Sequence, residues 1–216
     1  MIFAQWLLAF WLTFAPVLAF TSASAYVGAG TNDFTVGTVT WLGINNALGA
    51  PDSVVATSTV TTAATTTYYI KFSSFGFAIP GGATIDGVQA DLTTRYTTSG
   101  SGSMKWNAIR LVKDDGSIGA TDNDGNATMP TSLSPITSFG GAADLWGGDA
   151  TTDWNDADAG IVISCITVSA SDTMVAEIDA VQLVITYTEA PAGGTSPRRT
   201  IIGQARKLEF LPVRSQ

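Results

Sequence analysis

Hydrophobic and polar residues alternate through much of the middle of this chain, and turn-forming residues separate the alternating stretches. The clearest alternation lies in residues 86–96. One face of that stretch carries Val88, Ala90, Leu92, Thr94 and Tyr96. Because successive side chains of a strand point to opposite faces of a sheet, the pattern predicts a half-buried strand.

The stretch 176–187 predicts a central strand, since both of its faces are largely apolar from Val181 onward. We expect its alternation to run unbroken. One face would then carry Ile178, Ala180, Gln182, Val184 and Thr186, and the other Asp179, Val181, Leu183, Ile185 and Tyr187.

Further strands are predicted within residues 54–70, 106–113 and 161–168, which are rich in β-branched and aromatic residues. Turn sequences lie between them, including Pro-Gly-Gly at 80–82 and Asp-Asp-Gly-Ser at 114–117. No charged stripe with the period of a helix occurs in this middle part of the sequence. We therefore expect an all-β fold, an antiparallel β-sandwich with jelly-roll or immunoglobulin-like connections.

Composition supports a single β domain with appendages. Of the 216 residues, 45% are hydrophobic and 13% charged, and Thr, Val, Ile, Ser and Gly outnumber Lys and Glu. β-Branched residues suit a pleated surface, whereas Lys and Glu usually furnish helix surfaces. We place the sandwich at residues 26–189, between an apolar N-terminal segment (1–25) and a linker with a basic C-terminal arm (190–216).

The apolar N-terminal segment has two interpretations. Residues 1–32 carry no charged side chain, and Ala23-x-Ala25 is the small-residue pattern of a signal-peptidase site, although no Lys or Arg precedes the apolar run. Cleavage there would leave Tyr26 as the mature start. Retained, the segment would be an arm buried in an assembly through Trp6, Phe10 and Trp11. It would contact a membrane only as an uncleaved anchor, and its apolar run is short for a span.

The basic C-terminal arm combines cations with apolar residues. We expect an extended arm that pairs with or packs on another chain, and the alternative is a strand added to its own sandwich. The residues expected to make the contacts are Arg198, Arg199, Arg206, Lys207 and Phe210. The rest of the chain is acidic, which disfavours nucleic acid as a partner because like charges repel.

Composition also argues against catalysis. The chain has no His and one Cys, so it lacks the residues for a Ser-His-Asp or Cys-His site, a His-ligated metal site or an intrachain disulfide. Cys165 lies in an apolar run, which predicts a buried structural thiol. The carboxylates lie in Gly-, Ser- and Asn-rich turns, and no spacing singles out a pair for glycoside hydrolysis. We expect a protein that is not an enzyme and needs no cofactor.

Two acid-rich loops are candidate binding sites. Asp122, Asp124 and Asn126 place oxygen ligands at alternate positions, as a Ca²⁺ loop does, but the Gly and Glu of an EF-hand are missing, which favours a plain turn. In the second loop, Asp144 and Asp149 neighbour two tryptophans. Exposed, Trp146 and Trp154 would stack on a sugar and make a glycan site; buried, they would plug the end of the sandwich.

Several sequence motifs occur together in the order found in a known module. They are 45–52 (NNALGAPD), 75–80 (FGFAIP), 82–88 (GATIDGV), 144–147 (DLWG), 178–181 (IDAV) and 184–188 (VITYT). This set resembles a β-sandwich module of bacterial surface proteins and of virion-associated proteins of tailed bacteriophages. The resemblance covers about residues 38–188. It implies a sandwich displayed on a virion or a cell surface, and it carries over no site residues.

These observations lead to two functional hypotheses. The first is a structural or decoration protein of a bacteriophage virion, associated with the capsid, tail or a fibre. Its terminal arms would join it to other subunits, in a homo-oligomer or a larger virion assembly. The alternative is a secreted or cell-surface sandwich that binds carbohydrate through the loops around Trp146 and Trp154.

Overall fold

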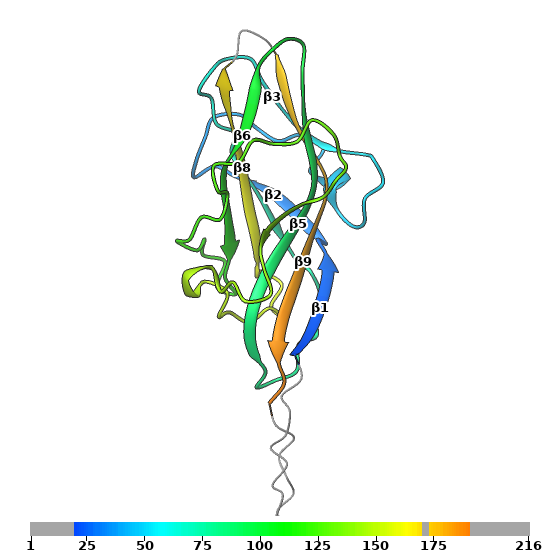
Figure 1. Cartoon of the computed structure of the whole chain (residues 1–216), viewed down its shortest axis with the longest axis vertical. Coiled ribbons are helices and arrows are strands. Elements are labelled where there is room, and N and C mark those ends of the chain that lie inside the picture. The colour runs from blue at the N-terminus through cyan, green and yellow to red at the C-terminus, as the bar shows by residue number, and fades with distance from the viewer. Residues whose placement is uncertain (1–19, 170–172, 191–216) are drawn as a thin grey trace, which may run out of the picture.

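The computed structural model describes residues 20–169 and 173–190. These residues form two antiparallel sheets packed as an elongated sandwich (Figure 1), which confirms the predicted all-β class. The strands are β1 (Phe20–Tyr26), β2 (Ala29–Asp33), β3 (Ala56–Val60), β4 (Tyr69–Ser73), β5 (Thr84–Thr98), β6 (Ser103–Val112), β7 (Thr137–Gly140), β8 (Gly160–Ser169) and β9 (Met174–Thr188).

One sheet has the strand order β1-β9-β5-β7, with β3 also paired to β9, and the other has the order β2-β4-β8-β6. Strand β9 lies between β5 on one side and β1 and β3 on the other, so the prediction of a central strand is confirmed. The predicted turn after β6 is also confirmed, because the Lys113 N–H donates to the Ser117 carbonyl.

The core lies between the two sheets and matches the alternation of β5. The predicted face of this strand, from Val88 to Tyr96, is buried, and Val88, Ala90 and Leu92 are fully enclosed. Trp41, Trp106 and Trp146 add the largest side chains that are shielded from water. Burial of this apolar area supplies most of the favourable free energy of a sandwich.

The expectation of unbroken alternation in β9 is wrong, because the strand contains a bulge at Asp179. Thr94 pairs with Ile178 and Thr93 with Ala180, so Asp179 has no partner on β5. The inward face therefore changes from even-numbered residues up to Ile178 to odd-numbered residues from Val181 onward. An extra residue in one strand shifts the side-chain alternation in this way.

The described ends change the predicted boundary of the domain. Residues 20–25 belong to β1, which pairs with β9 from Phe20 opposite Thr188 to Tyr26 opposite Gln182, so the sandwich starts before residue 26. The expected assembly contacts lie outside the described residues. They are Trp6, Phe10, Trp11, Arg198, Arg199, Arg206, Lys207 and Phe210.

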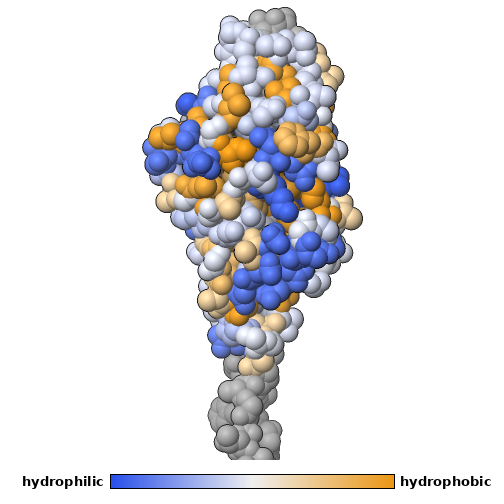
Figure 2. Space-filling model, turned by 180° about the vertical axis from the view of Figure 1, so that it is seen from behind, coloured by the Kyte–Doolittle hydropathy of each residue, from blue (hydrophilic) through white to orange (hydrophobic). Residues whose placement is uncertain are grey.

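Two short 3-10 helices, η1 (Ile44–Ala47) and η2 (Trp146–Gly148), lie in the loops. Within residues 20–169 and 173–190, the structure contains no helix whose length and hydrophobicity together would let it span a membrane. The face turned away in Figure 1 shows hydrophobic residues in small patches among hydrophilic ones (Figure 2). Scattered apolar residues of this kind are ordinary on a protein surface and do not by themselves mark a docking face.

Candidate functional site

Both tryptophans of the predicted glycan loop lie inside the protein. Trp146, in η2, is fully buried, and its Nε1 donates to the Val88 carbonyl of β5 over 2.9 Å. Trp154 is 3% exposed, and its Nε1 donates to the Ala150 carbonyl, while its ring meets Phe77 edge-on. Neither ring presents a face to solvent on which a sugar could stack. Their geometry is that of plugs at the edge of the core.

The carboxylates beside these tryptophans fix the surrounding loops. Asp144 accepts hydrogen bonds from the Trp146 N–H and from the Asn123 side chain. Asp149 accepts from the Thr121 N–H at 2.8 Å and pairs with Lys113 at 3.1 Å. The acids thus hold together segments that are far apart in the sequence, and their oxygens already have protein partners.

The pKa of Asp149 reflects this environment. Burial opposes ionisation, but the hydrogen bonds from Thr121 and the interaction with Lys113 outweigh it and hold the pKa below the usual value of an aspartate. The carboxyl group is therefore ionised at neutral pH. The ionised carboxylate stabilises the loop. A general acid at this position would need a raised pKa instead.

The residues of the predicted calcium loop do not converge on one point. Asp122 accepts from the Ile109 and Asp124 N–H groups and pairs with Arg110 at 3.2 Å. Asp124 accepts from the N–H of Asn126. Each side chain therefore closes a local turn. Across the part of the chain that the structure describes, no three acidic or thiol side chains gather as a metal site would require.

Cys165 lies on β8 at the centre of the sandwich and is fully buried, which confirms the prediction of a structural thiol. Its N–H donates to the hydroxyl group of Thr67. Burial raises the pKa of the thiol well above its ordinary value. Since the reactive species of a cysteine is the thiolate, this environment makes Cys165 inert.

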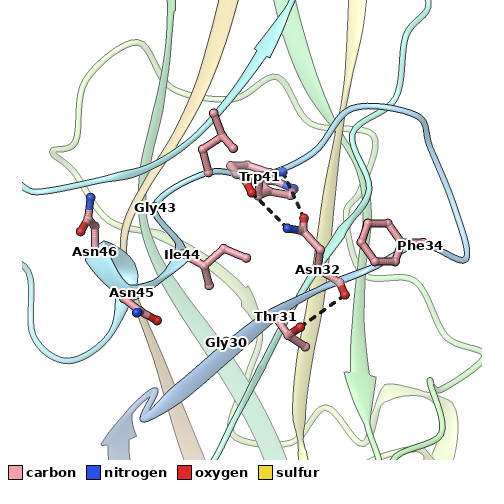
Figure 3. A pocket seen from close by; sticks show the side chains of 10 residues that line it. Gly30, Thr31, Asn32, Phe34, Trp41, Gly43, Ile44, Asn45 and Asn46 are labelled. Atoms are coloured by element: carbon pink, nitrogen blue, oxygen red, sulfur yellow. Dashed lines mark hydrogen bonds between the residues drawn. The ribbon is translucent and has the colours of Figure 1, made fainter.

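A surface hollow lies beside β2 and η1, at residues that the sequence analysis did not single out (Figure 3). It has a volume of about 640 Å³ and includes Phe34 and Leu42, which are 68% and 64% exposed. Phe34 packs edge-on against Tyr68, with ring centroids 4.8 Å apart. The hollow thus combines an exposed ring, an exposed aliphatic side chain and the amides of η1.

Hydrogen bonds make the floor of this hollow rigid. The side chain of Asn32 both donates to the Trp41 carbonyl and accepts from the Trp41 N–H, each over 3.0 Å. The indole of Trp41 is buried beneath, and its Nε1 donates to the Tyr68 carbonyl. In the sequence, Phe34 lies between Asp33 and Thr35 and Leu42 lies between Trp41 and Gly43, and no feature of these short stretches marks either side chain as exposed.

Comparisons of the chain with models of known families, with curated proteins and with solved structures find no match.

Proposed function

We propose that this chain is a non-enzymatic structural or decoration protein of a bacteriophage virion, joined to neighbouring subunits through its terminal segments. One observation carries the proposal. Phe20, at the start of β1, pairs with Thr188, at the end of β9, so both described ends of the chain lie at the same end of the sandwich (Figure 1).

This arrangement suits a body that is attached at one end and displayed at the other. Thr84, where β5 begins, also pairs with Thr188, so the three strands start or end together. The two long strands β5 and β9 then run together along the sandwich. Attachment through two neighbouring segments would define the direction in which such a body projects, without any contribution from its core.

Charge supports the same function. Residues 198–216 contain five basic residues and one acid, a formal charge of +4, while the preceding residues contain five basic residues and seventeen acids, a charge of −12. Opposite charges on the two parts of a chain favour contacts between neighbouring copies or with an acidic partner. Among the described residues, no three acidic or thiol side chains gather as a metal site would require, and Cys165 is buried.

The experiment is deletion of residues 191–216, followed by measurement of particle incorporation and of the mass of the purified protein. We expect assembly to be lost while the truncated chain keeps its β circular dichroism spectrum and cooperative unfolding. A matched variant with Arg198, Arg199, Arg206 and Lys207 changed to Gln keeps the apolar residues and isolates the effect of charge. Normal assembly of the truncated chain would refute the role of the C-terminal arm.

A further inference from the structure

The outer edge of β1 differs from the edges of β6 and β3, which other segments cover. The outer edge of β6 is covered, because the Met129 N–H donates to the Met104 carbonyl and the Trp106 N–H to the Ala127 carbonyl. The edge of β3 exchanges hydrogen bonds between Leu42 and Thr57. Among the described residues, the hydrogen bonds of β1 run to β9 alone, so its other side is available for pairing.

Strand β1 also lacks the features that usually protect a sheet edge. It is seven residues long, without a charged residue or proline, and its register with β9 contains no bulge. Proteins normally block an exposed edge with lysine, proline, a bulge or a very short strand, because unpaired N–H and C=O groups accept another strand. With none of these four features, β1 leaves its outer edge free to accept another strand.

The register shows which backbone groups face outward. Tyr26 lies opposite Gln182, and the next residue, Val27, donates its N–H to the Val181 carbonyl over 3.1 Å. In an antiparallel ladder the N–H and C=O of one residue point to the same side, and successive residues alternate. The odd-numbered residues of β1 therefore bond to β9. The outward-facing groups belong to Phe20, Ser22, Ser24 and Tyr26.

The same four residues have exposed side chains, and their order is self-complementary. Ala23 and Ala25 pack against the core, whereas Phe20 is 76% and Tyr26 36% exposed. Two antiparallel copies of β1 centred on Ala23 place Phe20 opposite Tyr26 and Ser22 opposite Ser24. Aromatic then meets aromatic and serine meets serine, all on the outer face of one continuous sheet.

We propose that β1 pairs with β1 of a second copy of this chain, antiparallel and about a two-fold axis at Ala23. This register satisfies every outward-facing backbone group of both strands, with about eight hydrogen bonds. A register shifted by one residue would set outward-facing groups against groups already bonded to β9. A shift by two would leave an aromatic residue without its partner. A two-fold contact is also the commonest form of homo-oligomer interface.

This inference does not depend on the proposed virion function, since it uses described residues of the sheet rather than the terminal segments. The test compares full-length wild type with two double variants, Ser22→Lys/Ser24→Lys and Ser22→Glu/Ser24→Glu, by sedimentation equilibrium. Lysine opposite lysine, or glutamate opposite glutamate, should weaken self-association roughly a hundredfold or more. An equal mixture of the two variants places Lys opposite Glu at each position and should restore association.

The control is Thr59→Lys, which adds one positive charge, half that of the double lysine variant, at the exposed residue of β3 in the same sheet and should leave association unchanged. Equal unfolding midpoints for the double variants and wild type would show that the fold is kept. The inference is overturned if the wild-type chain is monomeric, or if either double variant alone associates like wild type. It is equally overturned if the folded variants fail to associate when mixed.

Discussion

The loop around η2 and the hollow beside η1 differ in two respects. The loop has the residue types typical of a binding site but buries them, whereas the hollow lacks those types but exposes its side chains to solvent. The first contains Trp146, Trp154 and five aspartates within residues 144–158, yet both rings are buried and Asp144 and Asp149 bind protein groups. The second contains few residues of the types that usually mark a binding site, yet the side chains of Phe34 and Leu42 are mostly exposed to solvent. A side chain can recognise a ligand only where the fold leaves part of it exposed.

Among the variants that test this contrast, Trp146→Ala should cause the largest loss in the free energy of unfolding. The indole is fully buried and its Nε1 donates to the Val88 carbonyl, so removal leaves a cavity and takes away one of the two hydrogen bonds of that carbonyl, which keeps the bond from the Gly141 N–H. We expect a loss of about 3–5 kcal/mol in the free energy of unfolding, measured by urea titration. Trp146→Phe fills more of the space and should lose less. A loss under about 1 kcal/mol for the alanine variant would show that the ring does not support the core.

The fold was largely predictable, because sandwich strands leave a local signal. The alternation from Val88 to Tyr96 and the apolar faces after Val181 depend on neighbours in the sequence alone. The bulge at Asp179 was not predictable in this way. Its carboxylate accepts hydrogen bonds from the N–H groups of Asp52 and Ser53, more than 120 residues earlier, and no local pattern reports such partners.

The candidate sites were less predictable for the same reason. Trp146 is buried by its approach to Val88, 58 positions earlier, and Asp149 reaches Thr121, 28 positions earlier. A sequence shows that a tryptophan or an aspartate is present but not which distant backbone group it meets. The uncharged stretch that contains β1 suggested a leader or an arm. Its pairing with β9 depends on a strand more than 150 residues later.

A smaller effect is expected from Asp149→Asn, which keeps the shape of the side chain and removes its charge. The hydrogen bond from Thr121 and the ion pair with Lys113 are weakened, so we expect a loss of about 1–3 kcal/mol at pH 7. Urea unfolding of the variant and of wild type gives this difference. The matched control is Asp153→Asn, an exposed acid of the same loop, which should change stability by less than about 0.5 kcal/mol.

The pH dependence of this difference follows from the lowered pKa of Asp149. Because the folded state favours the ionised carboxylate, its contribution is fully present above the unfolded pKa of about 3.9. It is lost as the pH falls through the lower folded-state pKa. The difference in the free energy of unfolding between wild type and Asp149→Asn should therefore be constant from pH 7 to pH 5 and should become smaller below pH 4. A difference that grows in acid would contradict the assignment.

The smallest effect is expected in the hollow, from Phe34→Ala and Leu42→Ala. Both side chains are mostly exposed, and Phe34 contacts Tyr68 only edge-on, so little apolar area is lost when either is truncated. The hydrogen bonds between Leu42 and Thr57 involve the backbone and survive the change. We expect each variant to unfold within about 0.5 kcal/mol of wild type in urea. A loss as large as that of Trp146→Ala would mean that these side chains are structural too, and the contrast between the two regions would disappear.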